Sequence, residues 1–268
     1  MTARLQDKVA LICGAGSIGP GWGNGKATAA TFARAGAKVF CVDLNMDAAA
    51  ETAAIITGEG FEATAHAADV SDEAAVADMV AACVAKYGRV DILHNNVGIS
   101  LAGGDAEITE ITVEAFDHCV AVNLRGMVLT CKHALPSMRE RGSGSIVNIS
   151  SLAAWSAYPL VAYKTTKAAV VALTEQLAIL NARYGIRANV ILPGLMDTPM
   201  AVDTRVKVLQ KSREEIVAAR DAQVPLGRKM GTGWDIANAA LFLCSDEASF
   251  ITGAALPVDG GSSVSLGT

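Results

Sequence analysis

Short apolar segments alternate with longer helical segments along the whole chain, and this alternation constrains the fold more than any other feature. Strands that alternate with helices form βαβ crossovers, and hence a parallel sheet covered on both faces. The apolar runs are continuous, as is typical of strands buried on both faces. The pattern therefore predicts one doubly wound α/β domain over residues 1–268. The segments expected as strands are 8–13, 38–42, 91–94, 145–149, 187–192 and 254–258, and those expected as helices are 26–35, 48–56, 72–87, 114–139, 163–184 and 234–244.

One long stretch, 194–233, has no clear strand and is rich in polar and charged residues. A long excursion after a strand is more often a lid over a functional site than a plain connection, and a solvated flap is the alternative. Residues 214–220 within it have the pattern of a short surface helix.

The overall charge excludes several classes of partner. The chain carries 22 Lys and Arg against 27 Asp and Glu, with no basic tract. This balance argues against nucleic acid and against an anionic membrane surface as partners. The first eight residues do not resemble a signal peptide, and no run of about 18 apolar residues is long enough to span a bilayer. We therefore expect a cytoplasmic protein.

Neither the cysteines nor the histidines have metal-ligand spacing. The six cysteines are scattered without a C-x-x-C pair, and most lie in apolar runs, so we interpret them as buried reduced thiols. The four histidines are interpreted as packing or surface residues, and no metal site is expected.

A glycine-rich loop follows the first expected strand. Residues 14–25 read Gly-Ala-Gly-Ser-Ile-Gly-Pro-Gly-Trp-Gly-Asn-Gly, and a helix follows. Glycines at such a place allow a tight turn and let backbone N–H groups approach a pyrophosphate, to which the helix N-terminus adds its partial positive charge. The strand–loop–helix context is the one that the dinucleotide-binding motif requires.

Two registers of this loop compete. Gly14, Gly16 and Gly19 spell G-x-G-x-x-G literally, but the residues after them are too rich in glycine to form a helix. The helix more plausibly starts near Asn24, which can cap it. We therefore take Gly14 as the turn glycine and place Gly23 and Gly25 at the helix start.

Asp43 ends the second expected strand, twenty residues beyond Gly23. A carboxylate there accepts hydrogen bonds from both hydroxyls of an adenosine ribose and repels a 2′-phosphate. Neither residue 44 nor the 14–25 loop contains an Arg or Lys that would attract that phosphate. The sequence thus favours NAD over NADP, with a turn or cap role for Asp43 as the alternative.

Tyr163 and Lys167 are four residues apart at the start of a long helix, so they share one helix face. A neighbouring ammonium group stabilises a phenolate, whose ordinary pKa is about 10. A tyrosine with its pKa lowered in this way can exchange a proton with a substrate oxygen. The Tyr-x-x-x-Lys pattern alone is common, and its ordinary meaning is surface pairing.

Together with other motifs, this pair resembles the short-chain dehydrogenase/reductase family, over nearly all of residues 8–261. The order and spacing of the motifs carry the resemblance, since each one is weak alone. They are the glycine-rich first turn, Asp69-Val70, Asn95-Asn96-Val97-Gly98, Asn123-x-x-Gly126, Ile149-Ser150-Ser151, Tyr163-x-x-x-Lys167, Pro193-Gly194 and Asp259-Gly260-Gly261.

The resemblance implies a Rossmann domain with seven mainly parallel strands, and a hydride transfer between NAD(H) and a secondary alcohol or ketone. It makes Tyr163 the general acid/base, and Lys167 the group that lowers the pKa of Tyr163 and holds the nicotinamide ribose. A serine orients the substrate oxygen, and Asn123 anchors a water that links Lys167 to solvent. The other implied cofactor contacts are Asp69 and Val70 near the adenine, Asn96 and Gly98 along the cofactor, Pro193 and Gly194 after the strand, and Thr198 near the carboxamide.

This chain departs from the family pattern at several positions. Cys13 replaces a threonine before the first glycine, Val97 replaces a small residue, and the glycine loop is about five residues longer. The catalytic serine is ambiguous: Ser151 lies at the strand end, whereas Ser150 has the more familiar spacing of thirteen residues before Tyr163. We favour Ser151.

The substrate and the assembly are less constrained. Trp155 and Tyr158 are candidates to line an apolar or ring-shaped substrate pocket, with local packing as the alternative. By resemblance, 114–139 and 163–184 would pair between subunits in a homotetramer or homodimer. The basic residues Arg205, Lys207, Lys211 and Arg213 have two interpretations. They bind an acidic substrate, or they belong to a solvated flap, and we favour the flap.

Three other functions compete with an alcohol dehydrogenase. A non-catalytic NAD-binding sensor would not need to keep Asn123, Ser151, Tyr163 and Lys167 together. A methyltransferase has a similar glycine loop and ribose-binding acid, but not the Tyr-x-x-x-Lys helix. An enone or imine reductase on the same scaffold remains an alternative.

Overall fold

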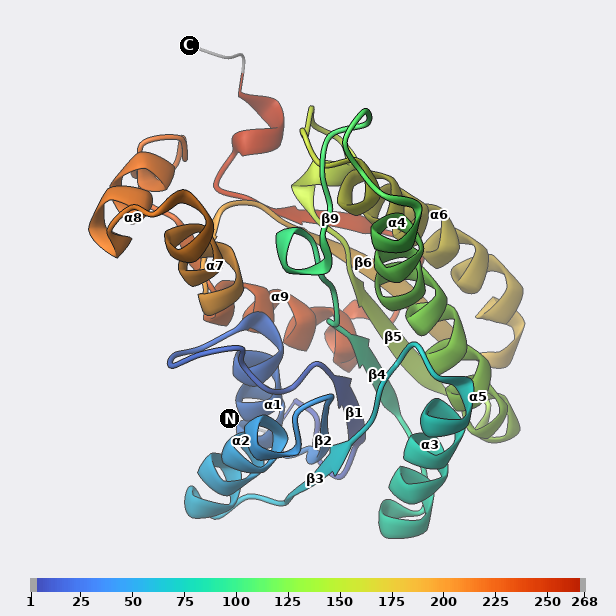
Figure 1. Ribbon diagram of the computed structural model, residues 1–268. Coiled ribbons are helices and arrows are strands. Elements are labelled where there is room, and N and C mark those ends of the chain that lie inside the picture. Colours follow the sequence, from blue (N-terminus) through green and yellow to red (C-terminus); the bar gives the residue numbers. More distant parts are fainter. Residues whose placement is uncertain (1–3, 266–268) are drawn as a thin grey trace.

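The computed structural model describes residues 4–265 and contains a seven-stranded sheet (Figure 1). All six pairs of neighbouring strands run parallel, and the strand order is β3-β2-β1-β4-β5-β6-β9. The predicted α/β Rossmann architecture is therefore confirmed. The strands are β1 (Val9–Cys13), β2 (Lys38–Asp43), β3 (Ala63–Ala67), β4 (Ile92–Asn95), β5 (Gly144–Ile149), β6 (Ile186–Pro193) and β9 (Ala255–Val258).

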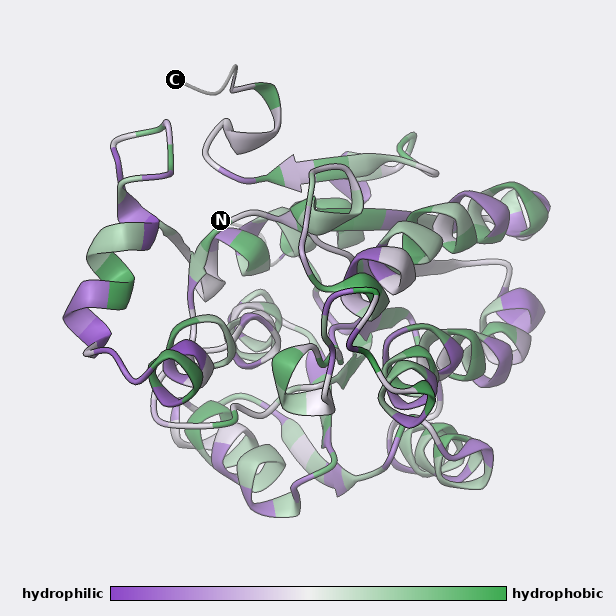
Figure 2. Cartoon of the chain, turned by 45° about the horizontal axis from the view of Figure 1, so that its top comes forward, coloured by the Kyte–Doolittle hydropathy of each residue, from purple (hydrophilic) through white to green (hydrophobic). Residues whose placement is uncertain are grey.

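Helices cover both faces of this sheet, and each face has its own apolar core. One layer contains α1 (Asn24–Arg34), α2 (Met46–Gly58) and α9 (Gly233–Cys244), and the other contains α3 (Glu73–Tyr87), α5 (Gly126–Arg141) and α6 (Val161–Asn181). Hydrophilic and hydrophobic residues alternate along these helices (Figure 2), as expected where one side faces the sheet. Short 3-10 turns complete the chain: η1 (Leu101–Gly103), η3 (Leu152–Ala154), η4 (Ala182–Tyr184), η5 (Asp246–Ala248) and η6 (Ser262–Val264).

The sequence pattern did not locate the seventh strand, β3. Its sequence is Ala-Thr-Ala-His-Ala, and its residues are only partly buried, except for the exposed Ala67. It lies at the edge of the sheet, paired only with β2. An edge strand needs no continuous apolar run, so it lacks the pattern by which the central strands were found.

The helix expected over 114–139 is interrupted. The structure has α4 (Val113–Val120), a π-helical turn η2 (Ala121–Arg125) and then α5. The π turn contains Asn123, whose side chain is buried. Such turns occur mostly at functional sites, and hydrophobic periodicity does not reveal them.

The long excursion, 194–233, folds as a small unit beside the glycine-rich loop (Figure 1). It contains β7 (Met196–Asp197), α7 (Pro199–Leu209), α8 (Arg213–Asp221) and β8 (Gly231–Thr232), so the short helix expected over 214–220 is confirmed. A separate apolar cluster, including Val202 and Ile216, holds the two helices together. A Cβ atom at Gly21 of the loop would lie 3.6 Å from Pro199 of α7. The excursion therefore packs against the glycine-rich loop.

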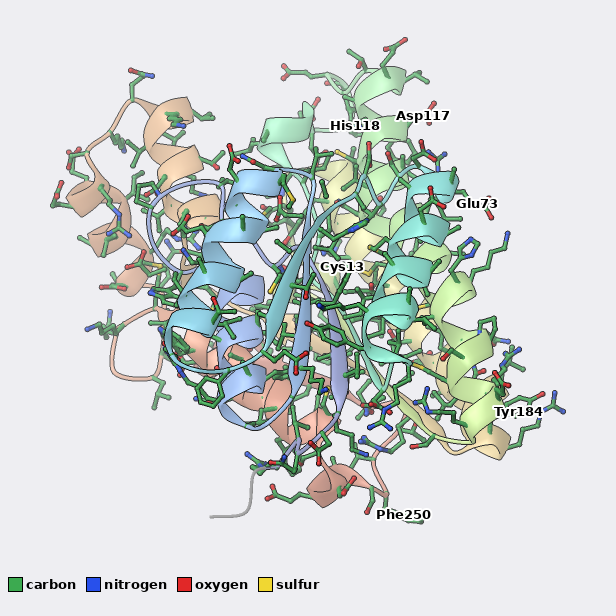
Figure 3. All side chains as sticks on the ribbon, turned by 90° about the horizontal axis from the view of Figure 1, so that it is seen from below. Cys13, Glu73, Asp117, His118, Tyr184 and Phe250 are labelled. Carbon is green, nitrogen blue, oxygen red and sulfur yellow. The ribbon has the colours of Figure 1, made fainter. Side chains whose placement is uncertain are left out.

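The six cysteines are free and buried, as the sequence predicts. Cys13 lies in the middle of the molecule at the end of β1, whereas Phe250 projects from its edge with a fully exposed side chain (Figure 3). Among residues 4–265, none of the helices has the length and apolar character needed to cross a membrane.

Replacing His94 with Leu should make the stability less dependent on pH. His94 is fully buried on β4, edge-on to Phe32, and burial lowers its pKa to about 3. Below about pH 6.5 the unfolded chain binds a proton here that the folded chain excludes, so stability falls on acidification by about 1.4 kcal/mol per pH unit.

This contribution is complete above about pH 6.5 and is lost progressively toward about pH 3. Urea unfolding of both proteins between about pH 4.5 and pH 6.5 measures the difference in slope. The same change at the exposed His118 is the control. Equal slopes for the parent and His94→Leu would refute this account.

Candidate active site

The carboxyl ends of β1, β4, β5 and β6 lie at the same end of the sheet, and the candidate residues follow these strands there. We call this end of the sheet the carboxyl edge. At the end of β1 the chain turns sharply at Gly14, whose φ is +81°. The Gly14 and Ala15 N–H groups both donate to the carbonyl oxygen of Val42 at 2.8 Å. A positive φ is costly for residues with a Cβ atom, so this turn needs glycine.

Helix α1 begins at Asn24, as predicted, but its N-cap is Gly23 and not Asn24. Gly23 has no side chain to accept a hydrogen bond from the first helical turn. The first N–H groups of the helix therefore remain available to an anion, together with the positive end of the helix dipole.

Gly25 permits the close approach of α1 to the first turn. A Cβ atom at Gly25 would overlap the carbonyl oxygen of Gly14. The Asn96 side chain donates to the same carbonyl at 3.1 Å, so it holds the turn from the end of β4. Gly14 and Gly25 of the chosen register thus occupy positions where a side chain would be strained or would clash.

The residues added to the loop are held by aromatic packing. The Trp22 ring lies 4.5 Å from the Trp234 ring of α9, measured between centroids, and the Lys26 ammonium lies 5.2 Å from the Trp22 ring. Sequence reasoning left the contacts of this loop undefined and did not single out Ser17. Among the described residues the buried Ser17 hydroxyl has no hydrogen-bond partner, so it is free to donate to a phosphate oxygen.

Asp43 lies at the end of β2 against the glycine loop. Its carboxylate accepts hydrogen bonds from the backbone N–H groups of Gly16 at 3.0 Å and Asn45 at 3.1 Å. The next residue, Leu44, is largely exposed. The structure thus has the Asp43 carboxylate at the position predicted to contact the adenosine ribose. The adjacent residue 44 is not a cation.

The other predicted cofactor residues line the same edge. Val70 is buried, and the exposed Asp69 accepts hydrogen bonds from Ser71. A Cβ atom at Gly98 would lie 3.0 Å from the Lys167 ammonium, so Gly98 leaves the space that this side chain needs.

Residues that follow β6 also lie at the carboxyl edge of the sheet. Pro193 ends the strand, and a Cβ atom at Gly194 would lie 2.7 Å from the backbone of Asp259, which explains that glycine by close packing. Thr198 is buried and caps α7 by accepting a hydrogen bond from the N–H of Ala201.

Tyr163 lies in the first turn of α6, between Ser151 and Lys167. The Ser151 side chain lies close enough to the Tyr163 phenol to lower its pKa, and its Oγ accepts a hydrogen bond from the Ala153 N–H at 3.1 Å. The Lys167 ammonium lies 5.6 Å from the centroid of the Tyr163 ring and donates to the carbonyl oxygen of Ile149 at 2.8 Å. Ser150 is buried, and its hydroxyl donates instead to the Lys167 carbonyl oxygen at 2.7 Å. Of the two serines, Ser151 is therefore the one beside the phenol.

The acid–base state of this group differs from the expectation that Lys167 lowers the pKa of Tyr163. Burial raises the pKa of the Tyr163 phenol to about 12, while the nearby Ser151 side chain and the charge of Arg205 oppose this rise. Burial also lowers the pKa of Lys167 to about 8. Desolvation disfavours the charged form of both groups, and the ammonium points to a backbone carbonyl rather than to the phenol oxygen.

Asn123 connects three segments around this group. Its Oδ1 accepts from the Ile99 N–H at 2.7 Å, and its Nδ2 donates to the Ile99 carbonyl at 2.9 Å and to the Thr166 hydroxyl at 3.2 Å. The predicted catalytic residues Asn123, Ser151, Tyr163 and Lys167 are thus brought together from the π turn, the end of β5 and α6.

One aromatic residue and one arginine lie near the phenol. The Tyr158 ring lies 5.5 Å from the Tyr163 ring, whereas Trp155 is half exposed. Arg205 of α7 is close enough to lower the pKa of Tyr163. Burial and, to a smaller extent, the charge of Arg205 lower the pKa of Arg220 of α8 to about 10. The excursion therefore directs positive charge toward the phenol, which a flap that only faces solvent would not do.

These features fit a nicotinamide dinucleotide. The uncapped start of α1 and the unpartnered Ser17 hydroxyl suit its phosphates. Asp43 suits its adenosine ribose, and Lys167 with Tyr163 lies across the edge from them.

Comparison with known proteins agrees with this architecture. A protein-family profile described as Enoyl-(Acyl carrier protein) reductase matches residues 20–263. The chain is 40% identical to 2,5-dichloro-2,5-cyclohexadiene-1,4-diol dehydrogenase from Sphingobium indicum, over 99% of this chain and 100% of that protein. It is 38% identical to levodione reductase from Leifsonia aquatica, over 98% of this chain and 96% of that protein. Among solved structures, NAD+-bound xylitol dehydrogenase superposes with a TM-score of 0.87 at 32% identity, covering 96% of this chain and 100% of that one.

Replacing Gly25 with Ala should weaken cofactor binding at least tenfold, because the new methyl group overlaps the Gly14 carbonyl and displaces the start of α1. NADH fluorescence titration measures the dissociation constant. Gly58→Ala is the matched control, since a Cβ atom there meets nothing within 4 Å at the end of α2. Unchanged NADH affinity in Gly25→Ala would contradict the assigned register.

Proposed function

The chain belongs to the short-chain dehydrogenase/reductase family of oxidoreductases, and we propose that it transfers a hydride between NAD(H) and a secondary alcohol or ketone. The observation that carries this proposal is the grouping of Ser151, Tyr163 and Lys167 at the end of the sheet where the glycine-rich loop also lies. A cofactor sensor without chemistry would not need an acid–base group there.

In the proposed mechanism, the bound nicotinamide supplies or accepts the hydride. Ser151 and Tyr163 hold the substrate oxygen, and the Tyr163 Oη gives it a proton during ketone reduction or removes one during alcohol oxidation. At neutral pH the phenol carries its proton, since burial raises its pKa to about 12, so it is ready to act as an acid. In the oxidation direction, the positive charge of Arg205 favours the phenolate.

We propose NAD as the natural cofactor. Asp43 supplies two acceptor oxygens for the ribose hydroxyls and repels a 2′-phosphate, and residue 44 is the apolar Leu44. Asp69, Val70, Asn96, Gly98 and Thr198, together with Pro193 and Gly194, form the remaining walls of this proposed site.

We propose a ring-shaped secondary alcohol or ketone as the substrate. The Tyr158 ring beside Tyr163 offers an apolar wall for such a ring. Two of the relatives reported above are named for a cyclohexadienediol and for levodione. Reduction of an enone or imine on the same scaffold is the alternative, and product analysis distinguishes it.

We also propose one domain over residues 1–268 that assembles as a homotetramer or homodimer in the cytoplasm. Exposed apolar side chains on α5 and α6, among them Val128 and Ile179, support an assembly through these helices. The six free, buried thiols agree with a reducing compartment. Light scattering coupled to size-exclusion chromatography measures the oligomeric state.

The first expected outcome is turnover with NAD and little with NADP. The substrates tested are cyclohexanol, 1-phenylethanol, xylitol and 3-hydroxybutyrate. Turnover is measured as the change in nicotinamide absorbance. Asp43→Asn keeps an acceptor for the Gly16 N–H but removes the charge, so the preference for NAD should fall about tenfold or more. A parent enzyme that prefers NADP would overturn this choice of cofactor.

The second expected outcome concerns Tyr163→Phe, which should abolish turnover while NADH still binds, because the ring remains and only the proton-transferring oxygen is lost.

In the parent enzyme, alcohol oxidation should speed up as pH rises from about 7 to 9, since oxidation needs the phenolate and burial raises the phenol pKa. Strong residual turnover in Tyr163→Phe would exclude Tyr163 as the acid/base.

A further inference from the structure

The first turn of α6 has no local cap, although it carries Tyr163. Its N-cap residue is Leu160, which has no side-chain acceptor, and Pro159 precedes it. The opening N–H groups of a helix need partners when they are buried, and Ala162 is fully buried. An acceptor from elsewhere in the chain must therefore satisfy this turn.

Asp105 supplies it from the loop between β4 and α4. One carboxylate oxygen accepts from the Ala162 N–H at 2.9 Å, and the other accepts from the Tyr163 N–H at 2.8 Å. The next carbonyl, that of Ala106, accepts from the Val161 N–H at 3.0 Å. These are the only hydrogen bonds of the Asp105 carboxylate within residues 4–265, and its side chain is buried.

A buried carboxylate is costly unless it is paired or fully hydrogen-bonded. Here two backbone donors and the positive end of α6 compensate for that cost. The carboxylate thus binds the backbone of Tyr163 itself, as well as that of the residue before it.

The Asp105 loop is anchored at its start by Asn123. The Asn123 side chain pairs with both backbone groups of Ile99, and its amide also donates to Thr166 of α6. The segment from Ile99 to Asp105 therefore links the π turn to the turn of α6 that carries the phenol, and it is held at both ends.

We propose that Asp105 is a positioning residue that caps α6 in trans and fixes the Tyr163 phenol against the substrate oxygen. This inference rests on the proposed function of Tyr163 as the acid/base. The carboxylate touches neither substrate nor cofactor in this role. It acts through the backbone of Tyr163.

The test compares Asp105→Ala with a matched control, Asp72→Ala. Asp72 also caps a helix through two N–H groups, those of Ala74 and Ala75, but it does so at α3. Asp105→Ala should lower kcat about 10- to 100-fold and leave the NADH dissociation constant within about twofold, since misplacement of a reacting group affects the chemical step. Asp72→Ala should keep kcat within about twofold.

Asp105→Asn provides the rescue, because its amide oxygen still accepts hydrogen bonds. We expect its kcat to lie between those of Asp105→Ala and the parent. Rates are measured with whichever of cyclohexanol, 1-phenylethanol, xylitol and 3-hydroxybutyrate the parent oxidises fastest, and they are normalised to the folded fraction.

Hydrogen–deuterium exchange gives a readout that does not depend on turnover. Asp105→Ala should accelerate exchange in peptides covering 160–166, and Asp72→Ala should not. Parent-like kcat in Asp105→Ala, or unchanged exchange at 160–166, would overturn the role of Asp105 alone. An inactive parent enzyme would overturn the proposed function and this inference together, so the two failures are distinguishable.

Discussion

The parallel pairing of the central strands is the constraint on which the rest of the structure depends. Because β1, β4, β5 and β6 all run in one direction, their carboxyl ends meet at one edge of the sheet. The strand order reverses beside β1, where crossovers leave toward opposite faces and open a crevice. The glycine turn, Asn96, Ser151 and Gly194 each follow one of these strands, so residues far apart in the chain become neighbours.

Two helix N-termini lie at this end of the sheet, and they differ in whether an acceptor from the protein binds their first N–H groups. The N-cap of helix α1 is Gly23, which offers no side-chain acceptor, and the positive end of the helix stays available to an anion. Helix α6 starts without a local acceptor as well, but the Asp105 carboxylate binds its first turn. One terminus is thus suited to a ligand, whereas the other is occupied so that Tyr163 is held in place.

Burial sets the proton state of the acid–base group. It raises the pKa of Tyr163 and lowers that of Lys167, because both would carry charge in a poorly solvated site. The cation of Arg205, on α7, acts in the opposite sense on the phenol. The excursion 194–233 therefore contributes to the electrostatics of the site.

The resemblance to the short-chain dehydrogenase/reductase family implied the grouping of Asn123, Ser151, Tyr163 and Lys167. Local patterns in the chain were enough to predict the α/β class, the central strands and the start of α1. These features depend on apolar runs, on glycine and on short-range spacing, which are properties of neighbouring residues. The edge strand β3, the π turn at Asn123 and the free Ser17 hydroxyl left no such local signal. The raised pKa of Tyr163 and its contact with Asp105 arise only when the chain folds, since burial and hydrogen bonding between segments 58 residues apart depend on packing and not on spacing.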